Sequence, residues 1–215
     1  MNSFLRLALL AGLSCASHVF VRADAAGDAL GRSVVEAAGS ARWSEVRRVA
    51  FTFNVEVGGE LKVSARHEWD VASGRDVVTV SGVSTAIDVR AAAPAAEPEK
   101  SAYARWVNDA YWLLMPLKVM DPGVTRADLG AKDFQGKPHR ALQLTFAGVG
   151  LTPGDTYVLY FEPGLLRFAG FDHQAAGAAT RTAVRQGETA AGGMNFATDF
   201  NFGVPRIFIT DLRVE

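Results

Sequence analysis

Residues 49–70 read VAFTFNVEVGGELKVSARHEWD, and their pattern decides the fold. Apolar and polar side chains alternate through both halves of this stretch, which is typical of two β-strands that each bury one face. The pair Gly58-Gly59 separates the halves and marks a tight turn. The sequence therefore predicts an antiparallel sheet that begins with a long hairpin.

The register of this hairpin follows from the requirement that both apolar faces point to the same side. The numbers of facing residues then differ by an even number, which a two-residue loop at Gly58-Gly59 would violate. A three-residue loop over residues 58–60 satisfies the rule. The expected facing pairs are Val57 with Leu61, Val55 with Val63, Phe53 with Ala65, and Phe51 with His67.

Most of the remaining chain repeats the strand pattern. Further strands are expected at residues 75–81, 83–90, 142–146, 157–161, 166–168, 194–202 and 207–214. Residues 174–193 are rich in Gly, Ala and Thr and are expected to hold at most one poor edge strand. The count of about ten strands is too high for a small α+β sandwich and favours a strongly curved or partly closed antiparallel sheet.

Two segments have helical spacing instead. Residues 27–38 predict a short amphipathic helix, and a longer apolar helix is expected between the proline-containing connection 91–100 and Pro116. Trp112 falls outside the apolar stripe of the longer helix, on the side of Asp109. That helix must therefore either pack on two sides or expose an indole.

Charge and motifs exclude several classes of function. The chain has 215 residues with 22 basic and 23 acidic side chains, a net charge of −1, so neither a nucleic-acid partner nor a polybasic membrane anchor is expected. No nucleophile elbow is present, and His67, His139 and His173 lack zinc-site spacing. We expect no catalytic residue, metal or cofactor, and we interpret His67 as a hydrogen-bonded histidine of the core or its rim.

The N-terminus has the pattern of a secretory signal over residues 1–25. Arg6 precedes an apolar run, and the small residues Ala23 and Ala25 frame a cleavage site. Cleavage after Ala25 leaves a single domain, residues 26–215, without a cysteine. The alternative is an outer-membrane lipoprotein acylated at Cys15, but Leu13 lies one place too late for that motif, which favours simple cleavage.

Several segments resemble a group of uncharacterised exported bacterial proteins that are similar in fold to the LolA and LolB lipoprotein carriers. They are the stretches NDAYWLLMPLK (108–118), DPGV (121–124), FAGVGLTPGD (146–155) and ITDLRV (209–214). The resemblance covers most of the predicted mature chain, and its distinctive segments lie within residues 106–171. It implies a periplasmic protein of mainly β (α+β) class, a curved antiparallel half-open β-barrel with helices covering the open side and a hydrophobic cavity between.

The resemblance is incomplete in two respects. The acylated N-terminal cysteine of the receptor form has a counterpart here only if Cys15 is lipidated, and the arginine that latches the carrier's lid has no assignable counterpart. Lipoprotein transport therefore rests on analogy of fold.

A set of apolar, mostly aromatic side chains is predicted to face the space between sheet and helix. In a filled domain they would form an ordinary core, whereas in a half-barrel some would line a cavity for an acyl chain. The candidate cavity residues are Phe51, Phe53, Trp69, Trp106, Tyr111, Leu114, Phe146, Tyr157, Phe161 and Phe168.

The sequence thus favours a non-catalytic periplasmic protein that binds a hydrophobic ligand, either a lipid or a lipoprotein acyl chain. The alternative is an envelope protein-interaction or stress-sensing module with a filled core, in which Trp112 and the connection 91–100 form an exposed surface that contacts a protein partner. The identity of the ligand stays open.

Overall fold

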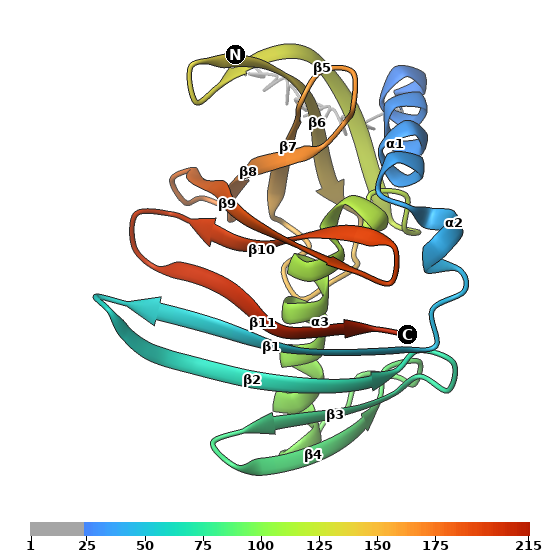
Figure 1. The fold of residues 1–215 in the computed structure, drawn as a ribbon, viewed down its shortest axis with the longest axis vertical. Coiled ribbons are helices and arrows are strands. Elements are labelled where there is room, and N and C mark those ends of the chain that lie inside the picture. Colours follow the sequence, from blue (N-terminus) through green and yellow to red (C-terminus); the bar gives the residue numbers. More distant parts are fainter. Residues whose placement is uncertain (1–23) are drawn as a thin grey trace, which may run out of the picture.

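The computed structural model describes residues 24–215, which form one sheet with helices packed on it (Figure 1). The predicted signal and Cys15 lie outside the described residues, except for Asp24 and Ala25 at the start of the first helix. None of the helices in residues 24–215 is long and apolar enough to cross a membrane.

Eleven antiparallel strands make up the sheet, in the order β4-β3-β2-β1-β11-β10-β9-β8-β7-β6-β5. The edge strands β4 and β5 do not pair with each other, so the sheet is not closed. This confirms the prediction of a mainly β, open antiparallel sheet. The strands are β1 (Arg48–Val57), β2 (Glu60–Asp70), β3 (Arg75–Val80), β4 (Val83–Asp88), β5 (Val124–Phe134), β6 (Lys137–Phe146), β7 (Thr156–Phe161), β8 (Phe168–Gln174), β9 (Arg181–Ala191), β10 (Met194–Asn201) and β11 (Arg206–Val214).

The helices α1 (Ala25–Ala37) and α3 (Glu99–Leu114) confirm the two helical predictions. A one-turn helix α2 (Ser40–Trp43) and a 3-10 turn η1 (Met115–Lys118) were not expected. Helix α1 packs on β5 and β6, and α3 crosses one face of the sheet, where it contacts β3, β4 and β10 (Figure 1). Helix α3 ends one residue before η1, whose second residue is Pro116.

The hairpin of β1 and β2 has the predicted register over most of its length. Phe51 faces His67, Phe53 faces Ala65, and Val55 faces Val63. The pair Val57 with Leu61 is wrong, because Val57 faces Glu60 across a two-residue turn. A bulge after Val55 absorbs the odd residue, so both apolar faces still point to the same side.

The prediction that residues 174–193 hold at most a poor edge strand is wrong. These residues contribute β9, an 11-residue strand inside the sheet between β8 and β10 rather than a poor edge strand. The true edge β5 was not predicted, because its side chains do not alternate between apolar and polar. It is held by β6 and by contacts with α1.

Close backbone contact seats α1 on β5. A Cβ atom at Gly27 would lie 2.7 Å from the carbonyl oxygen of Arg126, nearer than side-chain carbons approach. The Arg126 guanidinium also donates to Asp28 at 2.6 Å. Glycine at position 27 therefore sets the distance between helix and strand, and the ion pair fixes their alignment.

Trp112 lies in the core, and the interpretation of this residue as an exposed contact site is wrong. Only 9% of it is exposed, and its indole packs edge-on against Phe53, Phe171 and Phe200. Helix α3 thus packs on two sides, the first of the two alternatives that its sequence left open.

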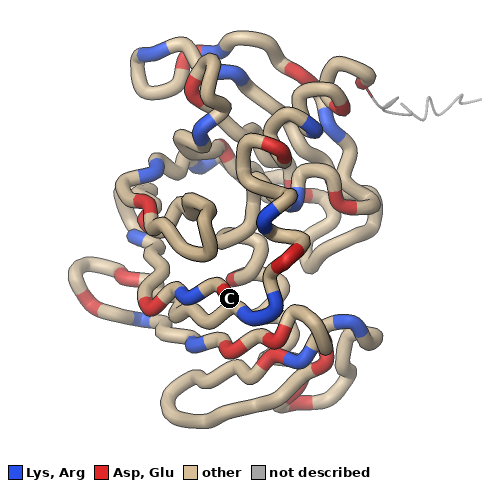
Figure 2. Tube along the Cα trace, turned by 45° about the vertical axis from the view of Figure 1, so that its right-hand side comes forward, with Lys and Arg blue, Asp and Glu red and all other residues tan. Residues whose placement is uncertain are grey.

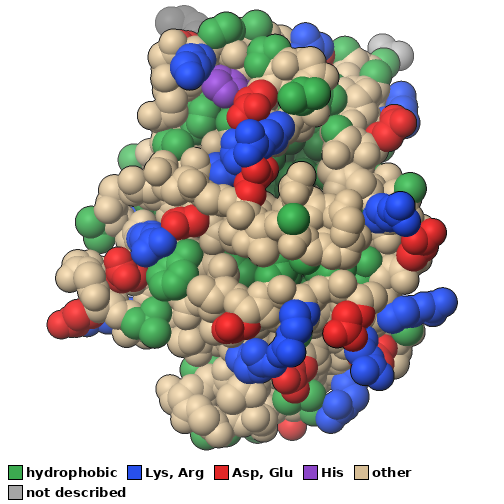
Figure 3. All heavy atoms as spheres, viewed as in Figure 1, with side chains coloured by type: hydrophobic (Ala, Val, Ile, Leu, Met, Phe, Trp, Pro, Cys, Tyr) green, Lys and Arg blue, Asp and Glu red, His purple; other side chains and the backbone are tan. Residues whose placement is uncertain are grey.

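Charged side chains of both signs are interspersed along the chain (Figure 2). The face in Figure 3 likewise shows Lys and Arg beside Asp and Glu, without a large patch of one sign. This distribution agrees with the balanced composition and gives that face no attraction for a polyanion.

We predict that Gly27→Ala destabilises the protein. The added Cβ overpacks against the Arg126 backbone, which costs about 1–3 kcal/mol, and the better helix propensity of alanine returns about 1 kcal/mol. Urea unfolding measures the difference. The control Ser33→Ala, at an exposed position of the same helix, should change the free energy of unfolding by less than about 0.5 kcal/mol.

We also predict that Trp112→Ala lowers the free energy of unfolding by about 3–5 kcal/mol, because it empties a volume that the surrounding phenylalanines cannot refill. Chemical denaturation checks this value. Unchanged stability would contradict the buried position of Trp112.

Candidate functional site

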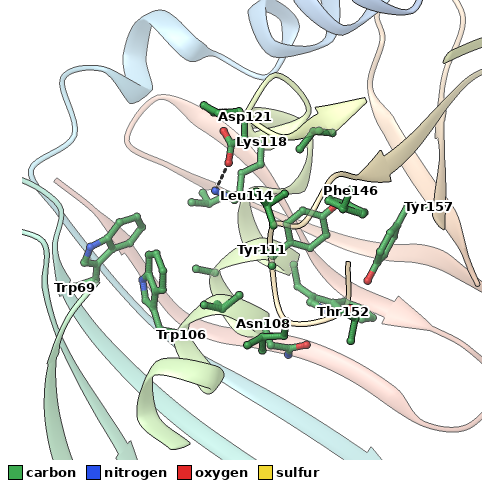
Figure 4. Close-up of a pocket in the computed structure, with 18 residues that line it drawn as sticks. Trp69, Trp106, Asn108, Tyr111, Leu114, Lys118, Asp121, Phe146, Thr152 and Tyr157 are labelled. Carbon is green, nitrogen blue, oxygen red and sulfur yellow. Dashed lines mark ion pairs between the residues drawn. The ribbon is translucent and has the colours of Figure 1, made fainter. Parts of the chain in front are cut away.

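A pocket of about 240 Å³ lies between α3, the start of β5 and the loop 147–155 that joins β6 to β7. Its wall is mostly apolar and aromatic (Figure 4). Trp69 and Trp106 lie on one side, and Tyr111, Phe146 and Tyr157 lie on the other (Figure 4). The volume is slightly below the range of about 300–1,000 Å³ typical of drug-sized ligands. It suits one narrow apolar group.

The structure divides the ten candidate cavity residues into two groups. Six line this pocket: Trp69, Trp106, Tyr111, Leu114, Phe146 and Tyr157. The other four do not line it and are buried in the core: Phe51, Phe53, Phe161 and Phe168. Phe168 also borders a second pocket, beside Leu113 and Met194. Periodicity could not separate the groups, because it reports which face of a strand is buried and not whether the space beyond is filled.

Part of the wall comes from residues that the sequence did not nominate. In the loop 147–155, Val149 and Leu151 line the pocket. Val149 seats on Gly123, where a Cβ would lie 2.5 Å from its Cγ1 atom. The loop therefore rests directly on the entry to β5, and the absence of a side chain at Gly123 makes room for it.

Aromatic edges, rather than hydrogen bonds, hold the wall together. Tyr111 meets Phe146 and Tyr157 edge-on, with ring centroids 6.0 and 5.5 Å apart, and Trp69 meets Trp106 in the same way at 5.6 Å. The indole nitrogens of both tryptophans and the Tyr111 hydroxyl are buried without a hydrogen-bond partner among residues 24–215. Such orphan groups carry a desolvation cost of about 1–3 kcal/mol each.

The wall is electrically neutral. Burial raises the pKa of the Tyr111 hydroxyl, with Tyr157 and Asp121 adding to the effect, and burial likewise raises the pKa of Tyr157, so both stay protonated. The two ionic groups at the pocket, Lys118 and Asp121, pair at 2.5 Å (Figure 4). The pocket therefore presents no net charge to a ligand.

A second feature, a buried ion network, lies where α3 meets the sheet. His67 of β2 is fully buried and stacks on Phe51, with ring centroids 4.6 Å apart. Its Nδ1 lies 2.7 Å from Asp76 of β3, and its Nε2 lies 3.1 Å from Asp109 of α3. Arg105 donates to both oxygens of Asp109, at 2.6 and 2.7 Å. The interpretation of His67 as a hydrogen-bonded core histidine is confirmed.

The network is consistent with a protonated His67. Each ring nitrogen of His67 faces a carboxylate oxygen. In a neutral imidazole one of these nitrogens carries no hydrogen, so its lone pair would face a lone pair of the carboxylate. Burial by itself lowers the pKa of His67, but the hydrogen bonds to Asp109 and Asp76 outweigh it and raise that pKa. A protonated His67 donates one hydrogen bond to Asp76 and one to Asp109, and Oδ1 of Asp76 is buried without a hydrogen-bond partner among residues 24–215.

The remaining polar pair near the pocket is separate from this network. His173 bonds Asp155 at 2.7 Å and stacks on Tyr157. Burial works against ionisation of Asp155, yet hydrogen bonds from His173 and Thr152 lower its pKa. Across residues 24–215, no group of three or more His, Cys, Asp or Glu side chains is arranged to hold a metal ion.

Comparison with known proteins identifies similar folds but no relative by sequence. No protein-family model matches the chain, and no curated protein matches its sequence. Solved structures do match. A DUF1329 family protein from Desulfovibrio piger is 11% identical with a TM-score of 0.52, and the match covers 88% of this chain and 92% of that one.

A LolA superfamily protein from Nitrosomonas europaea is 9% identical with a TM-score of 0.50, over 85% of this chain and 92% of that one. The fold is LolA-like. The resemblance inferred from the sequence is thus confirmed at the level of fold. At these identities, the LolA-like fold says nothing by itself about the ligand.

The ion network predicts a pH dependence of stability. Because the pKa of His67 is higher in the folded protein than in the unfolded chain, its stabilising contribution is complete below about pH 6.5, the unfolded value, and is lost as the pH rises through the folded-state pKa. Urea unfolding across this range should show that fall. His67→Gln should remove it, while His139→Gln, which contacts neither aspartate, should keep it.

Proposed function

We propose that this protein is a non-catalytic, exported binding protein of LolA-like fold that holds a hydrophobic ligand, a lipid or a lipoprotein acyl chain, in the pocket beside α3. The observation that carries the proposal is the neutral aromatic pocket between the helix and the open sheet. Binding would come from apolar contact, at about 0.8 kcal/mol for each methylene removed from water. The shape of the wall, rather than a charged recognition group, would select the ligand.

The arrangement of helices supports this reading. Helix α3 supplies Trp106, Tyr111 and Leu114 to the wall, while β2 supplies Trp69 from the opposite side. We propose that α1 and α3 cover the open side of a half-barrel formed by the curved sheet. The pocket is then the part of the enclosed space that side chains leave unfilled.

The proposed setting is the periplasm, with residues 1–25 removed as a secretory signal. A binding protein that carries acyl chains between membranes would need such a location. Asp24 accepts hydrogen bonds from Ala26 and Asp128 at the start of α1, so a cleavage site after Ala25 would remove a helix cap. Mass determination of the exported protein decides this point.

The alternative function, a protein-interaction or stress-sensing module, predicted an exposed contact surface made of Trp112 and the connection 91–100. Trp112 is buried and cannot belong to such a surface, whereas residues 91–100 are mostly exposed. An enzyme would be favoured if Asp155, His173 and His67 converged in one cleft. Asp155 and His173 meet at 2.7 Å, whereas His67 bonds Asp76 and Asp109.

Ligand binding is tested with a fluorescent fatty acid and with mass spectrometry of gently purified protein. We expect saturable binding and a co-purifying lipid. Val107→Trp places an indole in the pocket and should weaken fatty-acid binding about tenfold or more, because about 240 Å³ leaves no room for both groups.

The control is Ser101→Trp, at an exposed position of α3 outside the pocket, which should leave binding unchanged. The absence of both saturable binding and co-purified lipid would refute the proposal. Equal weakening by the two variants would place the binding site elsewhere.

A further inference from the structure

Five strand-to-strand connections lie at the same end of the sheet. They are 58–59, 81–82, 147–155, 175–180 and 202–205. The strand pairing places them there: Glu56 pairs with Arg206, and Ala65 with Val80. In Figure 1, the β1–β2, β3–β4, β8–β9 and β10–β11 connections all appear on the left-hand side. We call these five connections the loop rim.

Direct contacts link neighbouring loops of the rim. The loops 147–155 and 175–180 touch, since a Cβ at Gly154 would lie 3.1 Å from the Ala176 side chain. Arg181, which directly follows the second loop, donates to the carbonyl of Val204 in the next one. Three of the five connections, 147–155, 175–180 and 202–205, therefore form a continuous edge, and the hairpin turns 58–59 and 81–82 extend the same end of the sheet.

The loop rim has almost no charge. Its five connections contain a single ionisable acidic or basic residue, Asp155, which is buried and bonded to His173. The nearest exposed charges at the β1–β2 turn, Glu60 and Lys62, pair with each other. At the opposite end of the sheet, the β7–β8 connection alone contains both Glu162 and Arg167.

Exposed aliphatic side chains concentrate at this same end. Of the seven large hydrophobic residues that are exposed within residues 24–215, six lie in the rim or at the strand ends beside it, and the seventh, Leu165, lies at the opposite end. The six are Val57, Leu61, Val80, Val83, Leu151 and Val204. Leu61, Val83, Leu151 and Val204 are each more than half exposed.

We propose that the loop rim is a lipid-contacting surface, which inserts its aliphatic tips into the interface of a bilayer. Side chains that dominate protein–protein interfaces are Trp, Tyr and Arg, whereas Leu and Val are under-represented there, so the composition of the rim favours lipid over a protein partner. Apolar residues that enter the boundary between headgroups and acyl chains match this composition.

Arg181, which directly follows the connection 175–180, also suits contact with lipid. The Arg181 guanidinium lies over the Phe202 ring at 5.1 Å, and the only hydrogen bond of this side chain within the described chain is to the Val204 carbonyl. It forms no ion pair there, so its guanidinium can meet a lipid phosphate while the tips lie deeper. The rim also includes Leu151 of the loop that walls the pocket, so a membrane-bound protein would present the pocket to the lipid.

Binding to vesicles of the zwitterionic lipid phosphatidylcholine tests the inference, with protein purified after export. We expect co-sedimentation that persists from about 0.1 M to about 1 M salt, because apolar insertion is not screened. The triple variant Leu61→Asp, Val83→Asp and Val204→Asp should lose at least about tenfold in partitioning, since each aliphatic tip contributes on that scale. Because all three positions are exposed, the midpoint temperature of thermal unfolding should stay unchanged.

The matched control for the single change Leu61→Asp is Leu165→Asp, which adds one carboxylate at an exposed position of the far end and should bind vesicles like the unchanged protein. Absence of vesicle binding, its loss at high salt, or equal loss in the control overturns the inference. Fatty-acid titration of the triple variant keeps the two proposals distinguishable, because the pocket lining is unaltered in it. Vesicle binding without fatty-acid binding would refute the proposed function and leave the rim as the lipid contact.

Discussion

The position of α3 depends on a buried group of alternating charges, Asp76, His67, Asp109 and Arg105. Removing a charge from water costs several kcal/mol, and hydrogen bonds between the buried groups offset part of that cost. Because Asp109 and Arg105 lie on α3 while His67 and Asp76 lie on the sheet, a displaced helix would lose these bonds. Because Trp106, Tyr111 and Leu114 belong to the same helix, the network also determines where the pocket walls stand.

The aromatic residues have two roles: some fill the core, and others line the pocket. The indole of Trp112 packs on phenylalanines of the central strands, and the same residue also borders the pocket. Its neighbour Tyr111 meets Tyr157 and Phe146 edge-on, and all three rings line the pocket. Filled core and open pocket therefore adjoin each other along α3, and the open part lies beside the 147–155 loop.

The sequence predicted what depends on local pattern. Both long helices, the β1–β2 pairing and the open antiparallel class follow from periodicity and from the glycine turn. Strand β9 was missed because its side chains are mostly small or polar, so its place inside the sheet comes from pairing on both edges with β8 and β10. The partners of His67 were missed for a related reason: Asp109 is 42 positions away in the chain and meets it only after α3 docks.

The pairing of β1 with β11 has a consequence for how the chain acquires its structure. Val49 pairs with Val214, so the first and the last strand of the described chain lie side by side in the interior of the sheet. A strand near the start stays an unpaired edge until the last segment has emerged, and such long-range closure is slow. The sheet is therefore completed in its interior, between β1 and β11, rather than at either of its edges.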